Sequence, residues 1–478
     1  MLFPTVTFAI FFMVVLPVNW LLIRRQTRTQ WKLFMLAASY YFYAYWNVRF
    51  VFLLMASTLF NQLLGTAIHR NRNETQRRVL LTVAVVGNLG ILGYFKYYDF
   101  FVSSFQNMLD SFGVAISPSI ISITLPVGIS FFTFQALSYV IDIYRRQLEP
   151  TSLIDFAVYE SFFPHIVAGP IVRAAEFLPQ LKERHDPRRI DASKAFFLIF
   201  LGLFKKVVIA NYLATEIVDR VFANPARHSA LESLVAIYGY AVQIYCDFSG
   251  YTDMAIGLAL LLGFRFPQNF DAPYTSENLQ DFWRRWHMTL SRWLRDYLYI
   301  PLGGNRGSQL FTYRNLMLTM LLGGLWHGAA WTFVVWGGLH GFYLCAEHYR
   351  HGLRERRRLP ELRDTPLRRG LRRFVTFQLV CLAWVFFRSE SLDKAFELLG
   401  RLGPGNWFES SPDLKFTIIL AIALGIGAQY VPKEAMGRAM AAFSRLSPVT
   451  QGVVLGFALL VTHTLGPRGV APFIYFQF

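Results

Sequence analysis

The 478-residue sequence has few charged residues and few cysteines, and it lacks the motifs of several enzyme classes. Charged residues make up 16% of the chain, below the quarter or so that is typical of soluble domains, whereas 54% of residues are hydrophobic. The three cysteines, Cys246, Cys345 and Cys381, are far apart and predict neither a disulfide framework nor a zinc site. The absence of a Gly-x-x-x-x-Gly-Lys loop argues against an ATP-driven pump, and the absence of Gly-x-Ser-x-Gly argues against a serine hydrolase.

Apolar stretches of about 20 residues, each long enough to cross a bilayer, recur from Leu2 to the C-terminus. No separate soluble domain fits between these stretches. We therefore predict an all-α polytopic membrane protein in which residues 1–478 form a single membrane-embedded domain. The first apolar stretch has no basic residues before it and no small-residue cleavage site after it, which predicts a retained span rather than a removed signal peptide.

The net charge of +17 is concentrated at the ends of apolar stretches. Basic clusters lie at residues 24–28, 70–78 and 145–146, and the densest run extends from Arg350 to Arg373. Cytoplasmic loops of membrane proteins carry such an excess of lysine and arginine. The pattern therefore predicts membrane topology and contacts with anionic membrane lipid, and it argues against nucleic acid as a partner.

The hydropathy pattern predicts about a dozen membrane segments, with the N-terminus outside. The expected spans cover residues 3–23, a hairpin at 31–68 that turns near Asn47, and then 79–101, 120–144, 195–213, 231–262, 311–325, 331–345, 374–387, 416–431 and 453–464. With this topology, every basic cluster up to Arg146 falls on the same side of the membrane, as the positive-inside rule requires.

Two segments are not suited to spanning. Residues 156–171 are short and are interrupted by Pro164, Gly169 and Pro170, which predicts a re-entrant segment. Residues 281–300 predict an amphipathic helix that lies at the interface or dips in from the cytoplasmic side. In this segment Trp283, Trp286, Leu290, Trp293 and Tyr297 recur at helical spacing, and Arg284, Arg285, Arg292 and Arg295 occupy the remaining surface.

Ionisable side chains inside apolar segments are costly and mark candidate sites. His327 lies between Trp326 and Gly328 in an apolar stretch, and its imidazole could accept a proton from a hydroxyl. The neighbouring glycines at 323, 324 and 328 predict backbone room for a substrate beside the ring. For a membrane histidine taken alone, a hydrogen bond between helices is the more common interpretation.

His287 follows Trp286 on the amphipathic segment and could position either substrate, or the segment could be a simple interfacial anchor. The four arginines of that segment could hold the phosphates of a coenzyme A thioester or contact lipid headgroups. Asp247, Ser249 and Asp253 lie within a long apolar run, where the carboxylates need partners such as these arginines or a histidine. His165 and His340 could be packing histidines.

Long motifs in this order resemble bacterial members of the membrane-bound O-acyltransferase family, in particular those of the alginate O-acetylation type. The matching stretches are residues 131–145, 163–170, 247–257, 263–270, 281–306, 321–329, 384–388 and the closing 473–476. The resemblance implies a ring of about 10–12 transmembrane helices with re-entrant and interfacial helices at a thin centre. It also implies that His327 is the catalytic histidine and that His287 is functionally important.

The resemblance further implies an O-acyltransferase of the bacterial inner membrane that uses an acyl thioester, acetyl-coenzyme A, as donor and binds no metal or other cofactor. An extracytoplasmic acetyltransferase partner and a secreted polysaccharide are the expected acceptors. Substrate contacts are expected from Trp286, Arg284, Arg285, Arg292, Asp247, Ser249 and Trp326. The alternatives are D-alanyl transfer to teichoic acid, a polysaccharide or lipid transporter, and a scaffold that recruits an extracellular enzyme.

Overall fold

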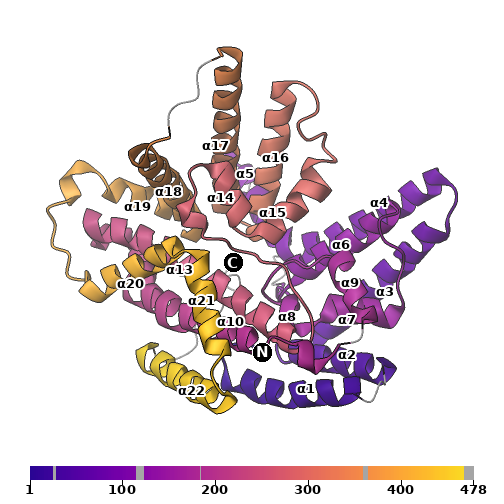
Figure 1. The fold of residues 1–478 in the computed structure, drawn as a ribbon. Coiled ribbons are helices and arrows are strands. Elements are labelled where there is room, and N and C mark those ends of the chain that lie inside the picture. The colour runs from indigo at the N-terminus through magenta and orange to yellow at the C-terminus, as the bar shows by residue number, and fades with distance from the viewer. Residues whose placement is uncertain (25–27, 115–122, 184, 359–363, 468–478) are drawn as a thin grey trace. The chain divides into compact units, whose positions relative to one another are not determined.

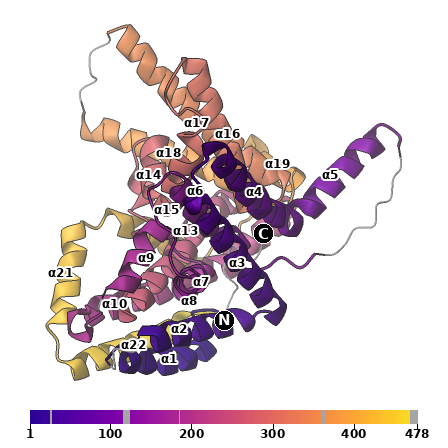
Figure 2. The ribbon, with the colours of Figure 1, turned by 90° about the vertical axis from the view of Figure 1, so that its right-hand side faces the viewer.

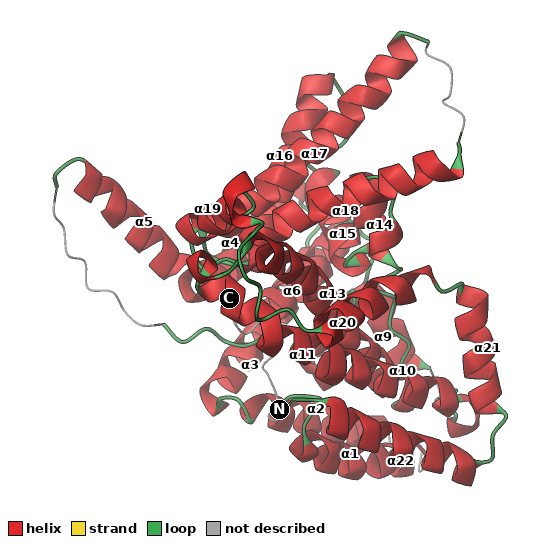
Figure 3. Ribbon diagram, turned by 90° about the vertical axis from the view of Figure 1, so that its left-hand side faces the viewer, coloured by secondary structure: helices red, strands yellow, loops and turns green. Residues whose placement is uncertain are grey.

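The computed structural model describes residues 1–24, 28–114, 123–183, 185–358 and 364–467, and this part of the chain contains helices and loops but no strand (Figure 3). The all-α prediction is therefore confirmed. Arg25, Arg363, the start of the predicted span at 120–144 and the closing residues 473–476 lie outside the described residues. The chain forms two compact units, which are residues 1–192 with 258–267 and residues 193–257 with 268–478. They are described separately below as unit 1 and unit 2.

Unit 1 begins with the predicted first span and hairpin. Its helices are α1 (Val6–Arg24), α2 (Arg28–Ala44), α3 (Val48–Arg70), α4 (Glu74–Leu92), α5 (Tyr98–Ser111), α6 (Ile129–Tyr144), α7 (Leu153–Ser161), α8 (Phe163–Ile166) and α9 (Ala174–Lys182). Helices α1 and α2 pack side by side (Figures 1 and 2). The side chain of Asn47 accepts a hydrogen bond from the Arg49 N–H and caps α3, which confirms the predicted turn.

The predicted break in residues 156–171 is also present. Helix α7 ends at Ser161, and the single turn of α8 begins with Phe163 and Pro164. Every residue of α8 is buried. Proline lacks an N–H and cannot continue the preceding helix, so the break follows directly from Pro164. His165 on α8 donates from Nε2 to the Tyr159 carbonyl (2.8 Å), as a packing histidine would.

Unit 2 carries the remaining helices, except for Ala192 of α10 and the last residues of α13 from Leu258, which belong to unit 1. The remaining helices are α10 (Ala192–Phe204), the short α11 (Asn211–Leu213) and α12 (Asp219–Ala223), α13 (Ala230–Leu261), α14 (Leu279–Arg285), α15 (Met288–Leu294), α16 (Gln309–His327), α17 (Trp331–Arg356), α18 (Pro366–Arg388), α19 (Leu392–Arg401), α20 (Phe416–Gly427), α21 (Lys433–Ser444) and α22 (Pro448–Leu465). Helices α16 and α17 form an antiparallel hairpin (Figure 1), and α18 packs against α17. His327 is the last residue of α16, at the turn of this hairpin.

Six described helices, counting continuous bent ones once, are long and apolar enough to cross a membrane. They are Val6–Ile23, Val48–Arg70, Glu74–Ser111, Ala192–Ala223, Pro366–Arg388 and Pro448–Leu465, and the bent pair Phe416–Tyr430 with Lys433–Ser444 would add a seventh. This number is below the ten to twelve expected from the sequence. Helices α13 and α17, which were expected to span, are long but carry ionisable side chains such as Asp247 and His340, which are buried among other side chains.

Candidate active site

The two histidines singled out in the sequence, His287 and His327, lie beside each other in unit 2. Their ring centroids are 6.4 Å apart, with an angle of 60° between the ring planes. Both residues are buried, with exposed fractions of 0% for His287 and 3% for His327. The fold therefore brings together two side chains that are 40 positions apart in the sequence, at the end of α16 and between α14 and α15.

His287 lies at a helix break that the sequence pattern does not predict. The expected helix over residues 281–300 is wrong, because α14 ends at Arg285 and α15 begins at Met288. His287 joins them with a φ of 42°, a left-handed conformation that is uncommon outside glycine. Such strain persists only where surrounding contacts impose it, and it is frequent at functional sites.

The contacts that impose this break come from Asn269. The Asn269 carbonyl accepts from the Met288 N–H (2.9 Å), and its side-chain Oδ1 accepts from the N–H (3.1 Å) and the hydroxyl (2.8 Å) of Thr289. The same Oδ1 lies 3.1 Å from Nδ1 of His287. Because a backbone N–H can only donate, the atom that Thr289 contacts must be the amide oxygen.

This arrangement fixes the tautomer of His287. The amide oxygen of Asn269 can only accept, so Nδ1 of His287 carries the proton and Nε2 keeps its lone pair. Nε2 is buried and has no hydrogen-bond partner among the described residues. Helices α14 and α15 have seven residues each and are too short to cross a membrane. Burial lowers the pKa of His287, which lies between them. The ring is therefore neutral and offers an acceptor nitrogen.

Aromatic rings surround the two imidazoles. Phe248 of α13 contacts His287 edge-on, with ring centroids 4.6 Å apart. Trp336 of α17 and Phe387 of α18 lie 5.0 Å and 5.3 Å from His327, also edge-on. Trp326 lies 5.0 Å from His327 and 6.1 Å from His287. The environment is apolar, so a proton transferred there meets little competition from bulk water.

The predicted role of the glycines near His327 is not what the structure shows. A Cβ atom at Gly324 would lie 2.3 Å from the Phe333 carbonyl oxygen, and one at Gly328 would lie 2.0 Å from the Phe333 ring. A Cβ at Gly337 would lie 2.4 Å from the Met320 carbonyl oxygen. These glycines therefore allow α16 and α17 to pack closely, and the space beside Gly324 and Gly328 is filled by protein rather than left for substrate.

The carboxylates of α13 have lysine partners rather than the arginines or histidine that the sequence suggested. Asp247 pairs with Lys206 at 2.7 Å, and both side chains are only 3% exposed. Asp253 pairs with Lys205, also at 2.7 Å. Ser249, between the two carboxylates, is buried on the same helix. The lysines lie near the end of α10, at a distance in the sequence that the local pattern could not reveal.

The four arginines predicted to form one face differ in their surroundings in the structure. Arg285 pairs with Asp281 (2.9 Å), and Arg295 pairs with Asp296 (2.6 Å). Arg284 is exposed and Arg292 is partly buried. Trp286, another predicted substrate contact, is buried and stacks on Phe282 with ring centroids 5.6 Å apart. Its ring packs next to His287, and its contact with substrate stays a prediction.

Several residues of this site were missed by sequence analysis. Asn269 holds His287, while Trp336, Trp384 and Phe387 pack around the pair or behind it. His340 is fully buried against Trp336, and neither of its ring nitrogens has a hydrogen-bond partner in the described part of the chain. No local signal points to Asn269, because polar residues such as Gln268 and Asp271 stand beside it in the same loop. Nothing local distinguishes the aromatic residues from ordinary packing.

A neutral imidazole with an acceptor nitrogen, beside a second buried imidazole, can accept a hydrogen bond from a hydroxyl and hold it next to a second ring that can act as base. Together with the membrane-spanning helices, this site defines the class of integral-membrane enzymes with a buried acid–base centre. Residues 100–377 match MBOAT, the membrane-bound O-acyltransferase family. The chain belongs to this family and is a multi-pass membrane O-acyltransferase, which confirms the resemblance read from its motifs.

Relatives within the family include enzymes with different acceptors. The chain is 45% identical over 384 residues to a probable alginate O-acetylase of Azotobacter vinelandii, covering 79% of this chain and 73% of the relative. It is 39% identical over 397 residues to a peptidoglycan O-acetyltransferase of Helicobacter pylori, covering 77% of this chain and 73% of that relative. It is 28% identical over 275 residues to a teichoic acid D-alanyltransferase of Bacillus subtilis, covering 55% of this chain and 68% of that relative.

Proposed function

We propose that the protein moves an acetyl group from a cytoplasmic thioester, acetyl-coenzyme A, to a hydroxyl on the outer side of the bacterial inner membrane, in the service of polysaccharide O-acetylation. The observation that carries this proposal is the buried pair of His287 and His327, with the unpartnered Nε2 of His287 facing an apolar environment. Acyl transfer to a hydroxyl needs a base that is neutral before reaction, and a shielded imidazole meets this need.

In the proposed reaction, the imidazole of His327 takes the proton of the acceptor hydroxyl while the oxygen attacks the thioester carbonyl carbon. The carbon–sulfur bond then breaks, and the leaving thiolate receives that proton from the imidazolium. The products are an acetyl ester and free coenzyme A, with no net change in protonation of the enzyme. The acceptor nitrogen of His287 first binds the hydroxyl and brings it beside His327, and the O–H then turns to His327 before its proton is transferred.

The placement of charge within unit 2 supports a cytoplasmic donor. The described basic residues from Arg350 to Arg358 and from Arg368 to Arg373 lie at the end of the α16–α17 hairpin opposite His327. Helix α14 starts at this basic end, since Glu347 accepts hydrogen bonds from the Leu279 and Gln280 N–H groups, and it leads toward His287. A polyanionic thioester that enters from the cytoplasm would meet these arginines first.

Acetyl transfer is favoured over D-alanyl transfer by the degree of similarity. The relatives named as O-acetylases or O-acetyltransferases are 39–45% identical to this chain, whereas the D-alanyltransferase is 28% identical. Their names include both alginate and peptidoglycan, so the acceptor is proposed at the level of a polysaccharide outside the membrane. An extracytoplasmic partner protein is proposed as the first acceptor of the acetyl group, with membrane lipid around the protein.

Thioester consumption tests this proposal. Purified protein in lipid vesicles is given acetyl-coenzyme A labelled in the acetyl group, and release of free thiol and transfer of label to a hydroxyl acceptor are followed. The proposal predicts acceptor-dependent thiol release that His327→Ala abolishes. Consumption of a D-alanyl carrier thioester instead would favour the D-alanyl alternative, and movement of polysaccharide without donor consumption would favour a transporter. Acetylation that needs the protein but not His327 would favour a scaffold.

A further inference from the structure

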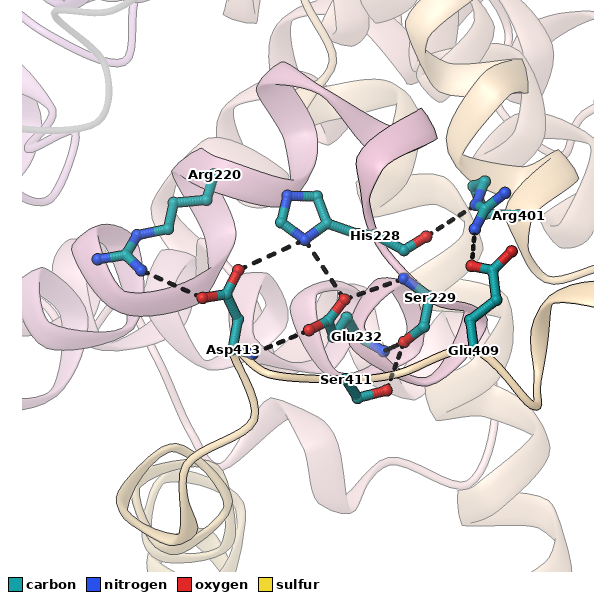
Figure 4. Close-up of polar contacts among 8 residues, drawn as sticks. All are labelled: Arg220, His228, Ser229, Glu232, Arg401, Glu409, Ser411 and Asp413. Atoms are coloured by element: carbon teal, nitrogen blue, oxygen red, sulfur yellow. Dashed lines mark hydrogen bonds and ion pairs between the residues drawn. The ribbon is translucent and has the colours of Figure 1, made fainter.

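Unit 2 contains a second cluster of ionisable side chains, which the acyltransferase reaction does not use. His228 lies before α13, Glu232 is in the first turn of α13, and Asp413 lies in the loop before α20 (Figure 4). One nitrogen or oxygen atom from each of these three residues lies within 4.8 Å of the other two. Figure 4 shows the imidazole of His228 directed at both carboxylates.

The two distances from His228 to the carboxylates are close to those between ligands of one ion. Nδ1 of His228 lies 3.4 Å from Oε2 of Glu232 and 3.6 Å from Oδ2 of Asp413. Ordinary N–H···O hydrogen bonds are shorter, at about 2.7–3.2 Å. A tetrahedral zinc ion with bonds of about 2.0–2.1 Å to nitrogen and oxygen separates its ligands by about 3.3–3.4 Å.

Neighbouring groups hold each carboxylate in place. Glu232 accepts from the Asp413 N–H (3.0 Å) through Oε1 and from the Ser229 N–H (2.9 Å) through Oε2. Arg220 approaches Oδ1 of Asp413 at 3.4 Å, which leaves Oδ2 directed toward His228. Metal ligands are commonly oriented by such outer hydrogen bonds, which set the direction of the binding atom.

Burial and charge also favour a bound cation. The side chain of Glu232 is 1% exposed, that of His228 is 12% exposed and that of Asp413 is 29% exposed. Two carboxylates held this close repel each other, and Arg220, which is half exposed, reaches only one of them. A divalent ion would balance both charges, and the partly exposed Asp413 provides a route of entry from solvent.

We infer that His228, Glu232 and Asp413 form a site for a divalent transition-metal ion of the zinc type. One imidazole nitrogen and two carboxylate oxygens suit zinc, whereas magnesium and calcium prefer oxygen ligands alone. The ion would tie the loop between α12 and α13 to the loop between α19 and α20, which the Ser229–Ser411 hydrogen bond (2.6 Å) also joins.

The cluster lies at the outer side of the membrane by the positive-inside rule. Arg388, the last residue of α18, pairs with Asp219 of α12 (2.8 Å), so α12 and the cluster that follows it lie at this end of α18. The basic residues Arg368, Arg369, Arg372 and Arg373 lie at the other end. The metal would therefore brace outer loops of the protein.

Metal binding by the full-length protein in detergent tests this inference. The protein is stripped with a chelator, titrated with zinc alone, and its bound zinc and thermal unfolding temperature are measured. Wild type is expected to retain about one zinc per chain and to unfold at a higher temperature with zinc. Asp413→Asn keeps the backbone N–H that Glu232 uses and should weaken zinc binding by at least about tenfold. Asp393→Asn, at an exposed position on α19, serves as the control and should bind zinc as wild type does.

Failure of wild type to retain zinc, or equal zinc binding by wild type and Asp413→Asn, would overturn the inference. Tighter binding of calcium than of zinc would overturn the assigned class of ion. If Asp413→Asn does not yield folded protein, His228→Gln replaces it and carries the same prediction. Unfolding of both variants would leave wild-type zinc content as the deciding measurement, because a wild-type protein without zinc contradicts the site.

Discussion

The side-chain oxygen of Asn269 lies 3.1 Å from Nδ1 of His287 and decides which nitrogen of that imidazole is free. The two residues are 18 positions apart, and Asn269 lies on the loop that follows α13. The same oxygen accepts two hydrogen bonds from Thr289, so the contact fixes both the break between α14 and α15 and the tautomer of the ring. Asn269 thus acts through His287 as a positioning residue.

Replacement of Asn269 is expected to affect activity through His287. Asn269→Ala should lower the rate about 10–100-fold, by analogy with the loss seen when a group that orients a metal-binding histidine is removed. Asn269→Asp keeps an acceptor but places a carboxylate beside Nδ1, which raises the pKa of His287. In the native protein, burial lowers the pKa of this ring. As the pH is lowered, Asn269→Asp should therefore protonate His287 and lose activity at a higher pH than the native protein does.

The measurement is the acetyl-transfer rate as a function of pH for wild type, Asn269→Ala and Asn269→Asp, with the amount of folded protein checked by size-exclusion chromatography. An unchanged pH profile in Asn269→Asp, at normal protein levels, would contradict the positioning role. A rate near wild type in Asn269→Ala would do the same.

The close packing of α16 and α17 predicts contrasting effects of two alanine substitutions. Gly324→Ala would place a Cβ 2.3 Å from the Phe333 carbonyl oxygen, which is backbone and cannot rotate away. We expect α16 to shift, with a loss of about 1–3 kcal/mol in stability and a larger loss of activity, because His327 ends the same helix.

Gly338→Ala is the matched control on α17. Its Cβ would meet only a Leu321 methyl carbon at 3.7 Å, which is an ordinary contact. The thermal unfolding temperature and transfer rate of Gly338→Ala should therefore stay close to those of wild type. Equal behaviour of the two variants would show that the helix crossing does not depend on Gly324.

The buried pair of Lys206 and Asp247 predicts a strong effect of removing one partner. Lys206→Met would leave the Asp247 carboxylate buried without its cation, at a cost of about 3–5 kcal/mol. The double substitution of Lys206→Met with Asp247→Leu removes both charges and should recover most of that loss. Thermal unfolding of the purified protein measures both effects.

Lys433→Met provides the comparison for this prediction. Lys433 pairs with Asp271 at 2.8 Å, but its side chain is 75% exposed, so its removal should change stability by less than about 1 kcal/mol. If Lys206→Met is as stable as Lys433→Met, the buried pair contributes no more to the stability of the protein than the exposed pair does.

Features set by local sequence were predicted well. The first span, the turn at Asn47 and the break at Pro164 each follow from apolar length, a capping side chain or a missing N–H. His327 was recognised as a candidate because ionisable groups are rare in apolar segments, and His287 from its amphipathic segment and the family resemblance. These features depend on residues that lie within a few positions of each other.

Features set by distant contacts were missed. Helical spacing over residues 281–300 suggests one helix, but Asn269 supplies competing hydrogen bonds that stop it at His287. The partner of Asp247 is Lys206, 41 positions earlier, and the glycines near His327 accommodate Phe333 of the next helix. No local pattern carries this information, since the contacts exist only once the helices are packed.

The central claim, that the His287–His327 pair carries out acetyl transfer, is tested most directly in cells. The acetyl content of the secreted polysaccharide is measured in a deletion strain complemented with wild type, His327→Ala, His287→Ala or the control His69→Ala, which alters an exposed histidine at the end of α3. With membrane levels of the protein equal, we expect acetylation to be restored by wild type and His69→Ala, lost with His327→Ala and reduced at least about tenfold with His287→Ala. Full acetylation with His327→Ala would contradict the proposed role of the pair.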